Sequence, residues 1–277
     1  MLKNRDVTEP RGWAFATVVG VVKPVFRAFT KCEWIDGHKV PASGGCVVVA
    51  NHISHSDPLV FGLFLYDQGR LVRYLAKDEV FHTPILKTLV KGAGQIPVKR
   101  LTTDAASAFS AAVEGIGHGE LIGIYPEGTL TRDPNLWPMT GKTGAARIAL
   151  TTGCPVIPVA QWGPQELLAP YSSKLKLFPR KRLVAGAGDP VDLSDLSGQP
   201  MTAQVLTEAT NRIMDAITEI LVDLRGEPAP ATRVLTRAKP GYARRAIRRR
   251  RLRGALNEQS SRFWSRVVGH RVLSGAR

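Results

Sequence analysis

The sequence predicts an α/β domain in which a largely parallel or mixed central sheet is flanked by helices. Short β-branched apolar runs alternate with longer amphipathic segments between residues 35 and 226, as in strand–helix–strand units. Apolar residues make up 44% of the 277 residues, which suffices for a large core and excludes a disordered chain. The run CVVVA at Cys46–Ala50 is typical of a strand buried on both faces.

The remaining elements are expected in strict alternation along the domain. Asp57 is expected to cap a helix over residues 59–66, with Pro58 at its first position. Pro158 predicts that its strand is an edge strand, carries a bulge or lines a ligand. The further strands are expected at 71–76, 95–98, 121–125, 156–160 and 183–186, and the further helices at 80–90, 103–116, 142–152 and 201–224.

Residues 1–34 precede the domain and are interpreted as a membrane-interface helical segment. The uncharged run 12–22 has eleven residues, fewer than the roughly 18–20 that span a bilayer. Residues 12–30 combine apolar and aromatic side chains with Lys23, Arg27 and Lys31, which fits a helix lying in the bilayer interface and broken near Pro24. The alternative is a helix packed on the surface of the domain itself.

The charge of the chain is concentrated in its last fifty residues. Of the net charge of +15, +12 lies in residues 227–277, which hold 14 Lys and Arg against two acids. This Arg-rich tail follows a Pro-containing linker, and it fits a membrane surface with anionic lipids, a solvated extension or a nucleic acid. The apolar Phe263 and Trp264 beside it favour the membrane and make nucleic acid the less favoured partner.

Three widely spaced cysteines, Cys32, Cys46 and Cys154, fit neither a disulfide framework nor a structural zinc site. We also expect no signal peptide, because residues 1–12 carry mixed charge and no small-residue cleavage site follows the run 12–22. We therefore expect a reducing compartment, with the protein peripheral or monotopic on the cytoplasmic face of the cell membrane, and no metal.

The segment NHISHSDP, residues 51–58, carries the chemistry with the clearest rationale. His52 leaves the end of a predicted strand and Asp57 lies five positions later, so the turn can bring the carboxylate onto the imidazole. A carboxylate on one ring nitrogen fixes the tautomer and leaves the other nitrogen to take a proton from an attacking hydroxyl. The alternative is a loop histidine beside an aspartate that serves only as a helix cap.

Three further segments lie at or just beyond predicted strand ends, where open α/β sheets bind ligands. GQIPVKR ends in Arg100, which suits bidentate phosphate binding. YPEGTLTR offers the polar groups of Glu127 and Thr129 around Gly128, which permits close backbone approach. Lys142, near a helix start before the strand VIPVA, adds a charge for a phosphate site.

The order of these blocks resembles the glycerolipid acyltransferases, specifically the 1-acylglycerol-3-phosphate acyltransferase family. His-x4-Asp is followed by Gly-x-Ile-x-Val-x-Arg, Pro-Glu-Gly-Thr and Val-Ile-Pro-Val, so the resemblance covers residues 35–225. It implies that His52 and Asp57 are catalytic, that Arg100 binds the acceptor phosphate, and that Glu127, Gly128 and Thr129 contribute to the acceptor site.

The chain departs from the family pattern at one position. The family often has Arg or Lys after Glu-Gly-Thr, whereas this chain has Leu130. Arg132 or Lys142 is the candidate for the missing charge.

The resemblance implies transfer of a fatty acyl group from acyl-CoA or acyl-carrier protein to the free hydroxyl of 1-acylglycerol 3-phosphate. The product is phosphatidic acid, a step in phospholipid biosynthesis, and no cofactor is expected beyond the thioester co-substrate. The alternatives are a different lysolipid or a lipid-linked sugar as acceptor, or a basic lipid-binding module without activity.

Overall fold

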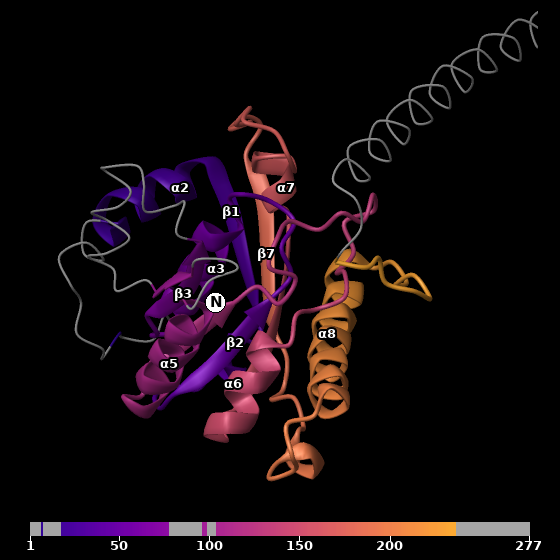
Figure 1. Cartoon of the computed structure of the whole chain (residues 1–277). Coiled ribbons are helices and arrows are strands. Elements are labelled where there is room, and N and C mark those ends of the chain that lie inside the picture. Colours follow the sequence, from indigo (N-terminus) through magenta and orange to yellow (C-terminus); the bar gives the residue numbers. More distant parts are fainter. Residues whose placement is uncertain (1–6, 8–17, 78–95, 99–103, 237–277) are drawn as a thin grey trace, which may run out of the picture.

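The described residues of the computed structural model, 7, 18–77, 96–98 and 104–236, form a seven-stranded mixed sheet with helices on both faces (Figure 1). The strand order is β1-β7-β6-β2-β5-β3-β4. All neighbouring pairs are parallel except β6 and β7, which run antiparallel. The strands are Thr30–Ile35 (β1), Cys46–Ala50 (β2), Val72–Lys77 (β3), Ile96–Val98 (β4), Leu121–Ile124 (β5), Val156–Trp162 (β6) and Lys181–Ala187 (β7).

The helices predicted at 59–66, 103–116, 142–152 and 201–224 are present with bounds shifted by at most two residues, whereas the short helix Pro164–Leu167 was not predicted. The α-helices are Lys23–Phe29 (α2), Asp57–Asp67 (α3), Asp104–Gly117 (α5), Gly144–Thr152 (α6), Pro164–Leu167 (α7) and Ala203–Arg225 (α8). Short 3-10 turns lie at Gly37–Lys39 and Ser194–Leu196, and a π-helical turn at Val18–Val22 precedes α2. The helix expected at 80–90 lies outside the described residues.

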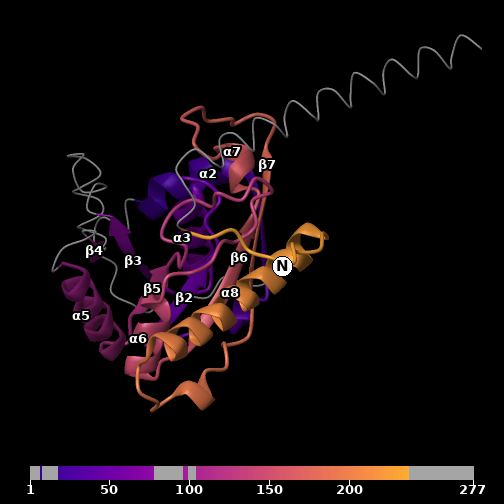
Figure 2. The same ribbon diagram turned by 45° about the vertical axis from the view of Figure 1, so that its right-hand side comes forward.

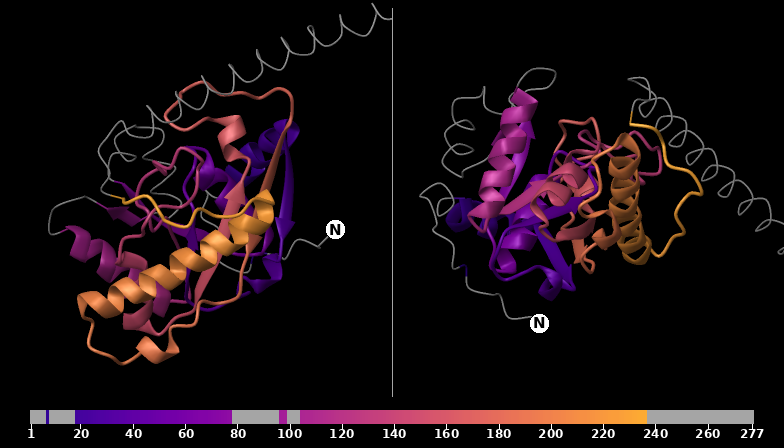
Figure 3. Two further views of the ribbon diagram at one scale, coloured as in Figure 1. Left: turned by 90° about the vertical axis from the view of Figure 1, so that its right-hand side faces the viewer. Right: turned by 60° about the horizontal axis from the view of Figure 1, so that its bottom comes forward.

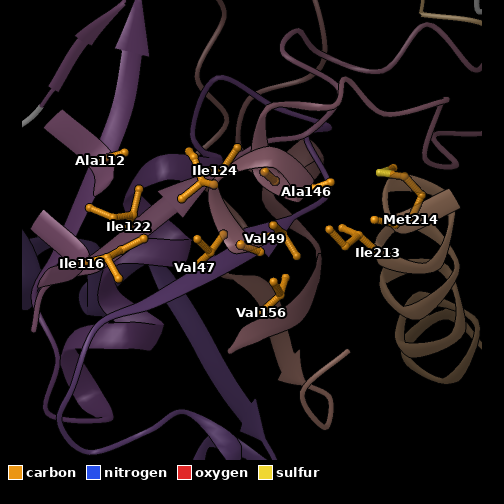
Figure 4. Close-up of a cluster of buried hydrophobic side chains, with 14 of the residues drawn as sticks. Val47, Val49, Ala112, Ile116, Ile122, Ile124, Ala146, Val156, Ile213 and Met214 are labelled. Atoms are coloured by element: carbon orange, nitrogen blue, oxygen red, sulfur yellow. The ribbon is translucent and has the colours of Figure 1, made fainter. Parts of the chain in front are cut away.

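The core is divided between the two faces of the sheet by β2. Alternate side chains of this strand point to opposite faces, and all five of its residues are buried. Val47 and Val49 join a cluster with α5, α6 and α8 (Figure 4), and the left view of Figure 3 shows α8 lying across this side. Cys46 and Val48 join the cluster under α3 on the opposite face. This double burial explains the continuous apolar run that predicted the strand.

Two expectations differ from the structure. β6 lies inside the sheet between β7 and β2, so Pro158 marks neither an edge strand nor a bulge. The Pro158 carbonyl accepts the Gly188 N–H at 2.8 Å, beyond the end of β7. Because the N–H and C=O of one strand residue point to the same side, the bond that Pro158 cannot make would also face Gly188, beyond the last β6–β7 pair, Val159 and Ala187.

The start of the domain also lies earlier than residue 35. β1 pairs with β7 from Thr30 to Ile35, so residues 30–34 belong to the sheet rather than to the preceding segment. Among the helices that the structure describes, none combines the length and the apolar character that crossing a membrane requires.

Candidate active site

The candidate site lies at the carboxyl ends of β2 and β5, which are neighbouring parallel strands. Parallel strands present their carboxyl ends at one edge of the sheet, so the turn after Ala50 and the turn after Ile124 meet there. The end of β2 is fixed to β6 by paired amides. Asn51 Oδ1 accepts the Gln161 N–H at 2.8 Å, and Asn51 Nδ2 donates to the Gln161 carbonyl at 3.1 Å.

The predicted contact between His52 and Asp57 is present. His52 Nδ1 lies 2.9 Å from Asp57 Oδ2, and the same oxygen accepts the N–H groups of Ile53 at 2.6 Å and Ser54 at 2.8 Å. The imidazole is 17% exposed, while the carboxylate is fully buried. Since Nδ1 donates to the carboxylate, Nε2 is the nitrogen that can accept a proton.

Asp57 differs from its expected place in the helix. Ser56 occupies the N-cap position and Asp57 is the first helical residue. Its carboxylate turns back toward Ile53 and Ser54 because these amides and His52 are the donors within reach. Burial raises the pKa of the Asp57 carboxyl, against the opposing effect of its hydrogen bonds to His52 and the two amides.

The imidazole packs on the ring of Tyr125 at the end of β5. The two rings are stacked with centroids 4.2 Å apart and an interplanar angle of 20°. Sequence reasoning missed this residue because only its place at the start of YPEGTLTR marks it, and stacking requires the two turns to be adjacent in space. The stack fixes the plane in which the imidazole presents Nε2.

The Glu127 carboxylate links the turn that carries His52 to the segment around Met139. Its Oε1 accepts the His52 N–H and its Oε2 accepts the Met139 N–H, both at 3.0 Å. The side chain is fully buried, and burial raises the pKa of the carboxyl to about 8. Both oxygens are engaged by backbone amides, so in this structure Glu127 holds the turn of His52, and its contribution to an acceptor site stays a prediction.

The structure brings Lys142 to the predicted block around Gly128. Gly128 has a φ of +65°, and a Cβ at this position would lie 2.8 Å from Lys142 Nζ. The Lys142 N–H also donates to the Pro126 carbonyl at 2.9 Å, and the Lys142 side chain is exposed, whereas Thr129 is half-buried. A cation beside exposed backbone suits an anionic group. Arg100 lies outside the described residues.

The departure at Leu130 has a structural reason. Its side chain is buried at 4% exposure, so this position packs into the protein instead of presenting a charge. Arg132 Nη1 donates to the Thr236 carbonyl at 2.9 Å. Of the two candidates for the missing charge, Lys142 is therefore the one that the structure places beside the Glu-Gly-Thr turn.

No group of three or more His, Cys, Asp or Glu side chains suited to a metal ion occurs in the described ranges.

Comparison with known proteins agrees with the resemblance inferred from the four blocks. Residues 32–162 match the family model described as Acyltransferase. The chain is 27% identical over 175 residues to the 1-acyl-sn-glycerol-3-phosphate acyltransferase of Bacillus subtilis, an alignment that covers 62% of this chain and 81% of the relative. It is 31% identical over 112 residues to the lyso-ornithine lipid O-acyltransferase of Pseudomonas aeruginosa, covering 40% of this chain and 41% of that protein.

A solved structure shows the same fold. The 1-acyl-sn-glycerophosphate (LPA) acyltransferase PlsC from Thermotoga maritima superposes with a TM-score of 0.55 at 18% identity. The match covers 78% of this chain and 81% of that one.

Proposed function

On the premise that this chain carries an acyltransferase domain and is an enzyme of that kind, we propose that it acylates the free hydroxyl of 1-acylglycerol 3-phosphate. The donor is acyl-CoA or acyl-carrier protein, and the product is phosphatidic acid for phospholipid biosynthesis. The observation that carries the proposal is the 2.9 Å contact between His52 Nδ1 and Asp57 Oδ2 at a sheet edge where ligands bind.

The proposed step is general-base catalysis without a covalent enzyme intermediate. His52 Nε2 takes the proton of the acceptor hydroxyl while the hydroxyl oxygen attacks the thioester carbonyl. The tetrahedral intermediate collapses, an ester bond forms, the carbon–sulfur bond breaks, and the thiolate leaves with the proton from the imidazolium. Buried Asp57 stabilises the imidazolium and holds its orientation. This sequence of steps invokes no metal and no redox cofactor.

Removal of the general base tests this function. We expect His52→Ala to lower turnover about 10²–10⁴-fold, as loss of a general base does, with an unchanged thermal unfolding temperature. The matched control is His55→Ala, which removes an exposed histidine of the same turn and should keep wild-type turnover. Acyl transfer is measured on detergent-dispersed 1-acylglycerol 3-phosphate with mass spectrometry of the product. Wild-type turnover by His52→Ala would contradict the mechanism.

A second candidate acceptor is a lysolipid without a free phosphate, and the buried Leu130 favours it. Leu130 is buried where the family often has a cation, and a lyso-ornithine lipid acyltransferase is among the relatives. A variant of Lys142 discriminates between acceptors with and without a phosphate, because the Lys142 ammonium lies beside Gly128 in the Glu-Gly-Thr turn. If the acceptor carries a phosphate, Lys142→Ala should raise the KM for 1-acylglycerol 3-phosphate about tenfold, as loss of a charge-assisted contact does. An unchanged KM, with faster turnover of a lysolipid that lacks a free phosphate, would favour the second class.

The location that fits this function is the cytoplasmic face of a membrane. The acceptor resides in a bilayer, and the tail from residue 227 carries a net charge of +12, which suits anionic lipid surfaces. We propose peripheral or monotopic attachment, with the tail supplying the long-range attraction.

A further inference from the structure

Exposed apolar side chains gather at one end of the molecule, on the π-helical turn Val18–Val22, on α2 and on the α7–β7 loop, residues 168–180. Val21 and Val25 are 59% and 55% exposed, and Leu175 and Phe178 are 56% and 75% exposed. The two segments are joined by an edge-on contact between the rings of Phe29 and Phe178, with centroids 5.4 Å apart. Figure 2 shows α2 close to α7 and the loop that follows it. We call this surface the α2–loop face.

The outer side of α2 follows a regular spacing. Val21, Val25 and Phe29 recur every four residues, so they lie on one side of the helical segment. The opposite side is fixed to the domain, because Phe26 is buried at 7% exposure and Lys23 and Arg27 both pair with Asp67. The predicted interfacial helix is therefore packed on the domain, its cations at 23 and 27 are engaged there, and its valine side remains uncovered by the described residues.

The loop is held so that its apolar side chains project outward. Leu168 and Leu175 form an antiparallel bridge, and the Lys176 N–H donates to the Leu167 carbonyl at 2.8 Å. Leu177 packs inward against the cluster that contains Phe26. Because the base of the loop is fixed in this way, the exposure of Leu175 and Phe178 is built into the fold.

The charge along the exposed part of the loop and the start of β7 has a single sign. Residues 172–182 contain five Lys and Arg and no acid, and Lys174, Lys176 and Arg180 are exposed. Lys31 adds a side chain that is 75% exposed, and the neighbouring Glu33 pairs with both Lys31 and Arg182. Protruding apolar side chains ringed by cations match an anionic lipid surface, whereas lysine is depleted at protein–protein interfaces.

The base of the loop is part of the wall of the candidate site. The Leu168 carbonyl accepts from Ser54 Oγ at 2.7 Å, within the turn that carries His52 and Asp57. The Tyr171 hydroxyl donates to the Thr131 carbonyl at 3.2 Å, in the segment that follows Glu127. A membrane surface that binds the loop would therefore lie next to His52 and Asp57.

We infer that the α2–loop face docks on an anionic lipid bilayer, with Leu175 and Phe178 inserted and Lys174 and Lys176 on the headgroups. The inference rests on the proposed function, because a protein that acylates a lipid acceptor must reach the bilayer that holds it. It goes beyond that function by assigning attachment to a surface that is separate from the Arg-rich tail.

The test is partitioning of the full-length chain onto vesicles of phosphatidylcholine with phosphatidylglycerol, measured by co-sedimentation. Leu175→Ser/Phe178→Ser should weaken partitioning at least about tenfold at high salt, where electrostatic attraction is screened and apolar insertion remains. Lys174→Gln/Lys176→Gln should weaken it about fivefold per charge at low salt and have no effect on pure phosphatidylcholine.

The matched control removes two exposed apolar side chains that lie outside the α2–loop face. Met201→Ser/Leu235→Ser alters residues that are 41% and 67% exposed and should partition as the wild type does. Partitioning of the Leu175/Phe178 variant at the wild-type level, or an equal loss in the control, overturns the inference.

The lysine variant keeps the test valid if the apolar variant fails to fold, since it changes only exposed charges. Retained vesicle binding by the lysine variant, with lost binding to duplex DNA, would assign these charges to nucleic acid instead.

Failure of this inference is separable from failure of the proposed function. Partitioning is read without turnover, so it reports docking even if 1-acylglycerol 3-phosphate is not the acceptor. On detergent-dispersed acceptor the loop variants should turn over as the wild type does, because none of the altered side chains contacts His52 or Asp57. On vesicle-embedded acceptor their turnover should fall in proportion to their partitioning.

Discussion

At the scale of single residues, Asp57 Oδ2 organises the candidate site, because His52 and two backbone amides all converge on it. We expect Asp57→Asn to lower turnover about 10²–10⁴-fold with little change in KM, since the amide cannot stabilise the imidazolium or fix its tautomer. The measurement is steady-state kinetics against acceptor and thioester separately.

Asp133→Asn is the matched control for Asp57→Asn. The Asp133 carboxylate is also buried and accepts backbone N–H groups, those of Asn135 and Trp137, but it lies away from the imidazole contact. Turnover by Asp133→Asn should stay near the wild-type value at equal stability. A similar loss in both variants would mean that Asp57 acts only by holding the turn.

The second prediction at this scale concerns the pH dependence of stability through Glu127. The pKa of this carboxyl rises from 4.5 to about 8 on burial, so between these values the folded protein holds a proton that the unfolded chain has released. The free energy of unfolding should therefore fall as the pH rises from about 4.5 to about 8 and should level off above that range.

Glu127→Gln isolates this effect. The amide does not titrate, so the stability advantage of the wild type over Glu127→Gln should shrink by a few kcal/mol from pH 5 to pH 8 in urea unfolding. The raised pKa of Asp57 acts with the same sign in both chains, so the difference reports Glu127 together with its electrostatic coupling to Asp57. A constant difference across this range would show that Glu127 is ionised throughout.

At the scale of elements, α2 is fixed to the end of α3 by one buried carboxylate. Asp67 has a side chain that is 1% exposed, and it accepts from Lys23 Nζ and Arg27 Nη2 at 2.6 Å and from Trp34 Nε1 at 2.8 Å. Because α2 carries half of the α2–loop face, this contact also positions that face.

We expect Asp67→Asn to lower the free energy of unfolding by about 1.5–3 kcal/mol, the range for hydrogen bonds to a charged group. Amide hydrogen exchange should rise in α2 before it rises in α3. The control is Asp189→Asn, which breaks an exposed pair with Lys39 and should cost at most about 1 kcal/mol. Equal protection of α2 in Asp67→Asn and the wild type would mean that packing of Phe26 alone holds the helix.

At the scale of the whole molecule, charge and chemistry lie in different parts of the chain. The tail after residue 226 holds +12 of the +15 net charge and contains none of the site residues. Each Lys or Arg near an anionic surface contributes about 1 kcal/mol, screened over a Debye length of about 8 Å at physiological salt.

Deletion of residues 240–277 should leave turnover on detergent-dispersed substrate unchanged and weaken binding to anionic vesicles at low salt. The residual binding at high salt should depend on Leu175 and Phe178, because apolar insertion is not screened. Vesicle co-sedimentation of both chains, with duplex DNA as a competing polyanion, measures this. Equal binding by the two chains at low salt would remove the membrane role of the tail.

The sequence by itself determined most of the elements, though not β1 or α7, and the contact of the central pair. The strand Cys46–Ala50 was predicted with its observed bounds, and the proximity of His52 to Asp57 followed from their spacing across one turn. Both are local properties: burial on two faces requires a continuous apolar run, and a five-residue separation constrains where a side chain can reach.

The tertiary structure alone decided how distant segments act on that pair. Tyr125 stacks on His52 and Glu127 binds its N–H because β2 and β5 are neighbours in the sheet, and the order of strands is not encoded in either local pattern. The same holds for α2, whose apolar sequence favoured the bilayer interface and left packing on the domain as the alternative. Its packing was settled by Asp67, 40 residues from Arg27 along the chain, because only the folded sheet brings that carboxylate under the helix.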